Sequence, residues 1–179
     1  VPWGWNVYLD TQGKDYASYT FVGPFDPDFH LGVPSLSIRW HAHHKLHHLR
    51  DGSFEVYSSG EEYMKKMVTM VYGPEYQYIQ HPQRIEVSGW EGKHFIVESL
   101  AEVPDTYKYG VSVDPSGKKS GVVRKHAYVV LPMDNGFYAL VYPATREGFA
   151  KHEKQFNQLV NTFAVLTDGP GGKKIKQPR

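Results

Sequence analysis

The chain has 179 residues, 40% of them hydrophobic, and its 20 Lys and Arg against 19 Asp and Glu leave a formal net charge of +1. This length and composition are typical of one globular domain with an ordinary core. The near balance of charge supplies no long-range field that would attract nucleic acid, and no apolar run of about 18 residues is present. We therefore expect neither nucleic-acid binding nor a membrane span.

The chain contains no cysteine, which excludes disulfides, thiolate nucleophiles and Cys-ligated metal sites. The sequence begins Val1-Pro2 without Met, which favours a leader that has been removed. We therefore expect an extracytoplasmic protein, in the periplasm or at the cell surface.

The first forty residues carry strand patterns. Residues 5–9 and 17–23 are expected to form two short strands around a turn at residues 12–15. Residues 35–40 alternate apolar and polar side chains, with Leu36, Ile38 and Trp40 on one face, which is the period of a half-buried strand.

A helix is predicted from about Ser59 to Tyr72. Ser58 and Ser59 are capping residues, and Glu61 and Glu62 follow three positions later, as a capping box requires. The apolar stripe of this helix consists of Tyr63, Met67 and Val71, with Met64 and Val68 beside them, and Gly73-Pro74 ends it.

Two hairpins and a second helix are expected in the rest of the chain. The first hairpin joins residues 84–90 to 94–101 across Glu91-Gly92, and the second joins 122–132 to 136–143 through Asp134-Asn135-Gly136, where Asn-Gly supplies the positive φ angles of a tight turn. Thr145 is expected to cap a helix that runs to about Phe163. Its apolar side consists of Phe149, Phe156, Val160 and Phe163.

These elements predict an α+β fold, in which a mostly antiparallel β-sheet is flanked by two main helices. Residues 1–166 are expected to form the single domain, and residues 167–179 a Gly/Pro/Lys-rich arm.

Two segments carry a family resemblance. One is the opening Val1-Pro2-Trp3-Gly4-Trp5, and the other is Gly136-Phe137-Tyr138-Ala139-Leu140-Val141-Tyr142-Pro143, followed by Phe149 and by Phe156-Asn157-Gln158-Leu159-Val160-Asn161-Thr162-Phe163. They resemble the PsbP/Mog1/DcrB-type sandwich, and the likeness spans residues 1–166 loosely, through hydrophobic spacings. It implies an α/β/α sandwich and, because known members are mostly accessory subunits, lipoproteins or binding proteins, a non-catalytic role. The histidine run and the Tyr-rich loops depart from the pattern, so no binding residue is carried over.

Half of the ten histidines lie in one eight-residue stretch: His41, His43, His44, His47 and His48. Imidazole is the commonest metal ligand, so the stretch is a candidate site for Zn, Cu or Ni. On a continuing strand His41 and His43 share a face, whereas on a helical turn His43/His47 and His44/His48 fall at the chelating i, i+4 spacing. His47, Asp51 or Glu55 is a candidate third ligand. The favoured interpretation is a solvated polar turn, so no cofactor is expected.

Tyrosines crowd two predicted loops, and lysines crowd the arm. Loop tyrosines are enriched at protein interfaces, although they equally cover sheet edges within one chain. The candidate partner-binding residues are Tyr72, Tyr76, Tyr78, Tyr107, Tyr109, Lys173, Lys174 and Lys176.

Three hypotheses follow. The first is a non-catalytic accessory or scaffold subunit of an extracytoplasmic assembly, whose partners are other protein subunits or copies of itself. The second is a histidine-based metal-binding or metal-delivery protein. The third is a metalloenzyme, which requires the histidines to converge on an ion with an open coordination position.

Overall fold

A seven-stranded antiparallel sheet runs through the computed structural model, which describes residues 4–29, 32–49, 52–73, 76–104, 119–167 and 169. In chain order its strands are β1 (Asn6–Gln12), β2 (Tyr16–Val22), β3 (Ser35–Ala42), β6 (Gln77–Val87), β7 (Trp90–Pro104), β8 (Lys119–Pro132) and β9 (Gly136–Thr145). They lie side by side in the order β1-β2-β3-β9-β8-β7-β6. A separate hairpin consists of β4 (Leu46–His48) and β5 (Phe54–Val56).

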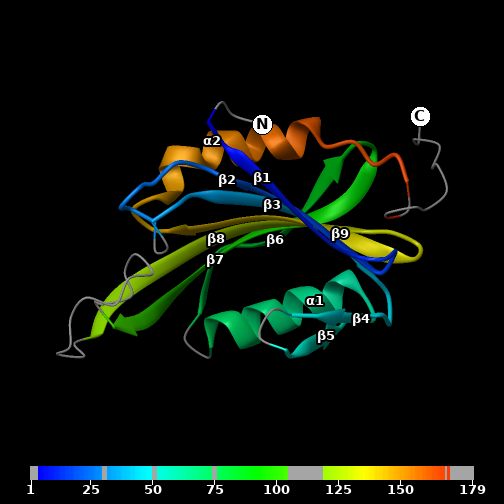
Figure 1. The fold of residues 1–179 in the computed structure, drawn as a ribbon, viewed down its shortest axis with the longest axis horizontal. Helices are drawn as coiled ribbons and strands as arrows, with labels where there is room; N and C mark the ends of the chain where they lie inside the picture. The colour runs from blue at the N-terminus through cyan, green and yellow to red at the C-terminus, as the bar shows by residue number, and fades with distance from the viewer. Residues whose placement is uncertain are drawn as a thin grey trace.

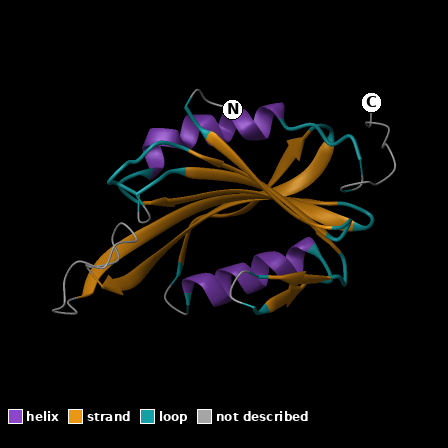
Figure 2. Cartoon of the chain, viewed as in Figure 1, coloured by secondary structure: helices purple, strands orange, loops and turns teal. Residues whose placement is uncertain are grey.

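The helices lie on opposite faces of the sheet. Helix α2 (Phe149–Thr162) covers one face, and α1 (Gly60–Lys66) lies on the other together with the β4–β5 hairpin (Figures 1 and 2). The prediction of an α+β fold with two helices flanking a mostly antiparallel sheet is therefore confirmed. Neither described helix combines the length and the apolar character needed to cross a membrane.

Helix α2 packs through the predicted aromatic side, because Phe149, Phe156 and Val160 are buried in the core against the sheet. The helix begins at Phe149 rather than near Thr145. The hydroxyl of Thr145 accepts the Gly148 N–H at 3.0 Å and so closes the turn that precedes the helix. The predicted cap therefore acts one turn before the helix starts.

Helix α1 begins as the capping box predicts. Ser59 is its N-cap residue and accepts the Glu62 N–H at 3.1 Å, while Glu62 Oε2 accepts the Ser58 N–H at 2.6 Å. After Lys66 the chain continues as a π-helical turn, Met67–Val71. A π turn holds one residue more than an α turn, so it rotates every side chain that follows it.

The first predicted hairpin turn was placed wrongly. Strands β6 and β7 are joined through Ser88-Gly89, whose φ angles of 55° and 79° match a tight two-residue turn, and Gly92 lies inside β7. A Cβ on Gly92 would lie 2.5 Å from Leu131 Cδ2 and 2.6 Å from the Val130 carbonyl oxygen. Gly92 therefore permits close packing instead of a turn.

We expect Gly92→Ala to lower the free energy of unfolding by about 2 kcal/mol, because the added methyl group overpacks a contact with backbone. The matched control is Glu91→Ala, which removes only an exposed ion pair with Arg84 and should cost about 0.5 kcal/mol or less. Urea unfolding measures both. If both substitutions lowered the free energy of unfolding by the same small amount, the result would instead favour a turn that contains residues 91 and 92.

Candidate functional site

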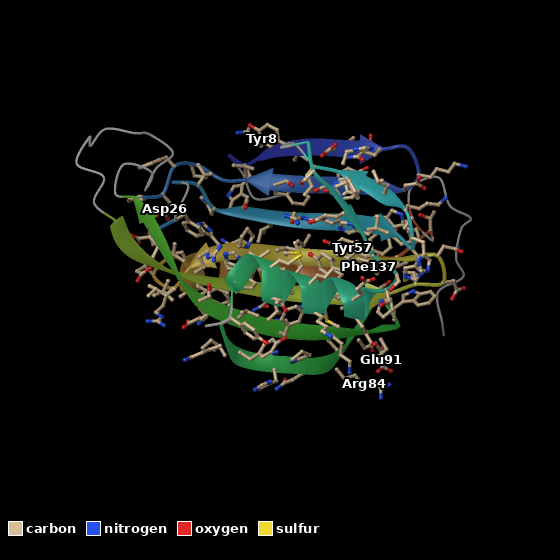
Figure 3. All side chains as sticks on the ribbon, turned by 90° about the horizontal axis from the view of Figure 1, so that it is seen from below. Tyr8, Asp26, Tyr57, Arg84, Glu91 and Phe137 are labelled. Carbon is tan, nitrogen blue, oxygen red and sulfur yellow. The ribbon has the colours of Figure 1, made fainter. Side chains whose placement is uncertain are left out.

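A cleft of about 690 Å³ opens on the α1 face of the sheet. Helix α1 packs over β8 and β9 and leaves β1–β3 beside it, as Figure 3 shows from the α1 side. The floor of the cleft is formed by these three strands, one wall by α1 with its π turn, and the other wall by the β4–β5 hairpin. A volume in this range suits a small ligand.

Strand alternation determines which side chains form the floor. Leu36 and Trp40 point to the α2 core, so Ser37, Arg39 and His41 point to the opposite face. In the neighbouring strands Tyr16 pairs with His41 and Ser18 with Arg39, while Asp10 pairs with Ser18. The polar side chains of β1, β2 and β3 therefore form one surface.

His41 is fixed in this floor by aromatic contacts. Its ring stacks on Phe137, with centroids 5.1 Å apart, and meets the Tyr57 ring edge-on at 5.3 Å. Tyr57 and Phe137 lie together beside the start of α1 in Figure 3. Burial, and secondly the positive charge of Arg39, lower the pKa of His41 to about 3. The imidazole is therefore neutral at physiological pH.

His47 reaches the same cleft from β4. Its ring stacks on Tyr16, with centroids 3.6 Å apart, and its Nδ1 lies 3.4 Å from Glu55 Oε2 across the hairpin. Burial lowers the pKa of His47, although Glu55 opposes this shift. The His41 and His47 rings are 5.5 Å apart, so the structure brings two of the five clustered histidines together.

The other three histidines lie outside this arrangement. Strand β3 ends at Ala42, so His43 leaves it, and His44 occupies the following turn with φ 56°. His48 is exposed, and its backbone N–H and carbonyl bond the side-chain amide of Gln12 at 2.9 and 2.7 Å. Neither predicted geometry, a continuing strand or a helical turn, is adopted. Asp51 lies outside the described residues.

The described residues contain no group of three His, Asp or Glu side chains arranged to hold a metal ion. His41, His47 and Glu55 bring two imidazoles and one carboxylate to the cleft. Metal binding by the histidines therefore stays a prediction.

The π turn determines which residues of the α1 segment face the cleft. Tyr63, Val68 and Tyr72 are buried in the core, whereas Met67 and Val71 line the cleft. The step from Tyr63 to Val68 is five residues, which is the π spacing. The predicted stripe of Tyr63, Met67 and Val71, with Met64 and Val68 beside them, lies in or against this core, with Tyr63 and Val68 buried and the other three partly buried. The π turn shifts the most deeply buried positions after Tyr63 to Val68 and Tyr72.

The same rotation removes Tyr72 from the surface. Its side chain is 4% exposed, and its hydroxyl is hydrogen-bonded to Tyr128 and, at 2.6 Å, to His126 Nδ1. The prediction that Tyr72 belongs to an exposed docking loop is therefore wrong. Burial raises its pKa.

Tyr76 and Tyr78 are half-buried, and their rings meet edge-on at 5.5 Å. Tyr78 lies in β6 rather than in a loop, and its ring also contacts Phe95. The remaining candidate partner residues are outside the described part of the chain: Tyr107, Tyr109, Lys173, Lys174 and Lys176.

Asp10, Arg39, Glu55 and Tyr63 were not recognised as members of one site, although Glu55 was considered as a metal ligand. They come from β1, β3, β5 and α1, and only the register of the sheet brings them to the cleft. A local signal existed for Arg39, because Ser35, Ser37 and Arg39 form the polar side of an alternating strand.

The two edges of the sheet differ in construction. Edge strand β6 contains Pro82 and two register shifts against β7, between Tyr78 and Gln80 and between Gln80 and Gln83. Edge strand β1 pairs with β2 in seven consecutive registers and contains neither Pro nor Lys. Its Val7, Tyr8 and Leu9 side chains are each at least half exposed, and Figure 3 labels Tyr8 at this edge.

Comparison of the chain with protein-family models and with curated proteins gives no match. The resemblance to the PsbP/Mog1/DcrB-type sandwich therefore stays a prediction.

Burial of neutral His41 should make stability fall on acidification. Its pKa is about 3 when folded and about 6.5 when unfolded, so the unfolded chain binds the proton first. Stability is therefore complete above pH 6.5 and decreases as the pH falls towards 3. By pH 5 this one group costs about 2 kcal/mol.

Urea unfolding at pH 7.5 and pH 5 checks this dependence. His41→Gln should lose about 2 kcal/mol less than the wild type between the two pH values. Val68→Ala is the control, because it opens a cavity in the core without removing a titratable group. Its free energy of unfolding should be lower than that of the wild type by the same amount at both pH values. If His41→Gln lost as much free energy of unfolding as the wild type between pH 7.5 and pH 5, His41 would not be the group responsible for the pH dependence.

Proposed function

We propose that this protein is a non-catalytic accessory or scaffold subunit of an extracytoplasmic protein assembly, and that it docks by adding a strand of a neighbouring subunit to β1. The observation that carries the proposal is the difference between the two sheet edges. Exposed edge strands are templates for pairing, and proteins usually block them with Pro, Lys or β-bulges. Edge β6 has a proline and two register shifts, and β1 has neither.

The side chains around β1 support a docking role. Val7 and Leu9 are 50% and 58% exposed, and Tyr19, which pairs with Leu9 in β2, is 48% exposed. The strand register places these three side chains on the α2 face of the sheet, because Val7 pairs with Phe21 and both Ala17 and Phe21 belong to the α2 side of the core. A strand added at β1 would bond the free backbone groups and cover this apolar surface.

A second copy of the chain is the simplest occupant. Antiparallel pairing of two β1 strands about Leu9 places Asp10, the only charged residue of β1, opposite Tyr8 of the second copy. No like charges meet, and the apolar side chains of both copies lie on the same face. The resemblance to a family of accessory subunits favours the same class of function.

We expect Leu9→Lys to abolish concentration-dependent association, because a charge at the centre of the edge strand blocks pairing. The matched control is Ile79→Lys on β6, where the side chain is 49% exposed. Multi-angle light scattering after size exclusion measures the mass, and hydrogen exchange at rising concentration measures the protection of the β1 amides.

The wild type and Ile79→Lys should form the larger species with β1 protected, and Leu9→Lys should not. A wild type that stays monomeric at several hundred micromolar, with β1 amides exchanging at an unchanged rate, would contradict self-association. A larger species that Leu9→Lys does not affect would place the interface elsewhere.

A further inference from the structure

Unpartnered polar atoms gather in the cleft between α1, the β4–β5 hairpin and β1–β3. Among the described residues, the buried side-chain atoms without a hydrogen-bond partner include His41 Nε2 and Tyr63 Oη, and both residues line this cleft. His41 and Tyr63 are 4% and 1% exposed. A buried polar group without a partner is costly, so its persistence calls for a functional explanation.

Two charged groups of the cleft also lack an ion-pair partner among the described residues. The Nε of Arg39 donates to Ser37 Oγ at 3.2 Å, and among the described residues neither Arg39 nor Asp10 forms an ion pair. Ser18 stands between them in the sheet, so Arg39 and Asp10 are two strand spacings apart, roughly 10 Å along the floor. Glu55 adds a second carboxylate on the hairpin side, next to His47.

The cleft is therefore dipolar. Its cationic end has the guanidinium of Arg39 with the unpartnered groups of Tyr63 and His41 beside it, and its anionic end has Asp10 and Glu55. A simple anion would meet two carboxylates, and a simple cation would meet Arg39. A molecule that carries both charges complements both ends.

Apolar side chains form the wall between the two ends. Met67 and Val71 from the π turn lie along the cleft, and Tyr16 presents its ring on the opposite side, stacked with His47. A ligand that fills this space carries an apolar side chain in addition to its charges.

We propose that the cleft binds a free α-amino acid with an apolar side chain. Its carboxylate is held by Arg39, Tyr63 and His41, and its ammonium group by Asp10 and Glu55. The side chain lies against Met67 and Val71. This site goes beyond the docking proposed for the β1 edge, because docking uses the backbone groups of β1 whereas the site uses the Asp10 side chain.

The protonation state of His41 suits this role. Burial and Arg39 keep the imidazole neutral, so it offers one N–H to a carboxylate without adding a second positive charge. The tyrosine hydroxyl is likewise neutral, because burial raises the pKa of Tyr63. Among the described residues that line the cleft, Arg39 is then the one Lys or Arg side chain that the carboxylate meets.

Isothermal titration calorimetry on the whole chain tests the proposal with four probes. These are L-phenylalanine, 3-phenylpropanoate, which lacks the ammonium group, 2-phenylethylamine, which lacks the carboxylate, and glycine, which lacks the side chain. L-Phenylalanine should bind saturably and at least about tenfold more tightly than each of the other three. Titration with Zn²⁺ alone is run in parallel.

Two variants assign the ends of the site. Arg39→Gln should weaken L-phenylalanine about tenfold or more, and Asp10→Asn should weaken it towards the affinity of 3-phenylpropanoate without weakening 3-phenylpropanoate itself. Arg84→Gln, in an exposed pair on β6, is the control and should bind as the wild type does. Because the four probes are compared on the wild type, the test remains decisive if Arg39→Gln does not fold.

Three outcomes would overturn the proposal. No saturable binding of any organic probe to the wild type refutes the site. Equal binding of 3-phenylpropanoate and L-phenylalanine refutes the zwitterion in favour of a simple anion. Binding of Zn²⁺ alone, lost in a His41→Ala/His47→Ala variant, identifies the cleft as a metal site instead.

Discussion

A sheet of seven strands is wider than one helix, and this constraint determines the chemistry of the face that α1 covers. Six spacings of about 4.8 Å make the sheet roughly 29 Å across, whereas a helix with its side chains is about 10–12 Å thick. A single helix therefore covers only part of a face. On the α1 side the covered part is β7–β9, and β1–β3 remain open to the cleft. The surface of β1–β3 that α1 leaves open needs polar side chains, since exposing three strands of apolar side chains to water is unfavourable.

The side chains change character where the cover ends. Across the pairing of β3 with β9, Arg39 stands opposite Ala139 and Ser37 stands opposite Val141. Buried apolar residues continue from β9 into β8 and β7, and polar ones continue from β3 into β2. The boundary between core and cleft is therefore one strand spacing wide. His41 and Phe137 form the pair at this boundary, which explains why the histidine is both buried and a member of the cleft.

Local sequence signals predicted much of the fold, because caps, turns and alternation act within a few residues. The Ser59/Glu62 cap, the second hairpin and the alternation of residues 35–40 are all present in the structure. The turn of that hairpin differs from the prediction, because the Met133 N–H donates to the Gly136 carbonyl, Asp134-Asn135 lie between them, and Gly136 has no positive φ angle. The β4–β5 hairpin was missed, because each of its strands has only three residues. The site was predicted only as a histidine cluster. Arg39, Tyr63 and Asp10 join it through pairings between distant segments, and no spacing along the chain records those pairings.

The π turn in the α1 segment ties two parts of the molecule to one helical register. Its extra residue turns Val68 and Tyr72 into the core and Met67 and Val71 towards the cleft. Deleting one residue there would restore α geometry and rotate everything after it by about 100°. The core would lose the Tyr72–Tyr128 contact in the same step in which the cleft lost its apolar wall. Length changes in this segment are therefore constrained on two sides, by the packing of the core and by the shape of the cleft.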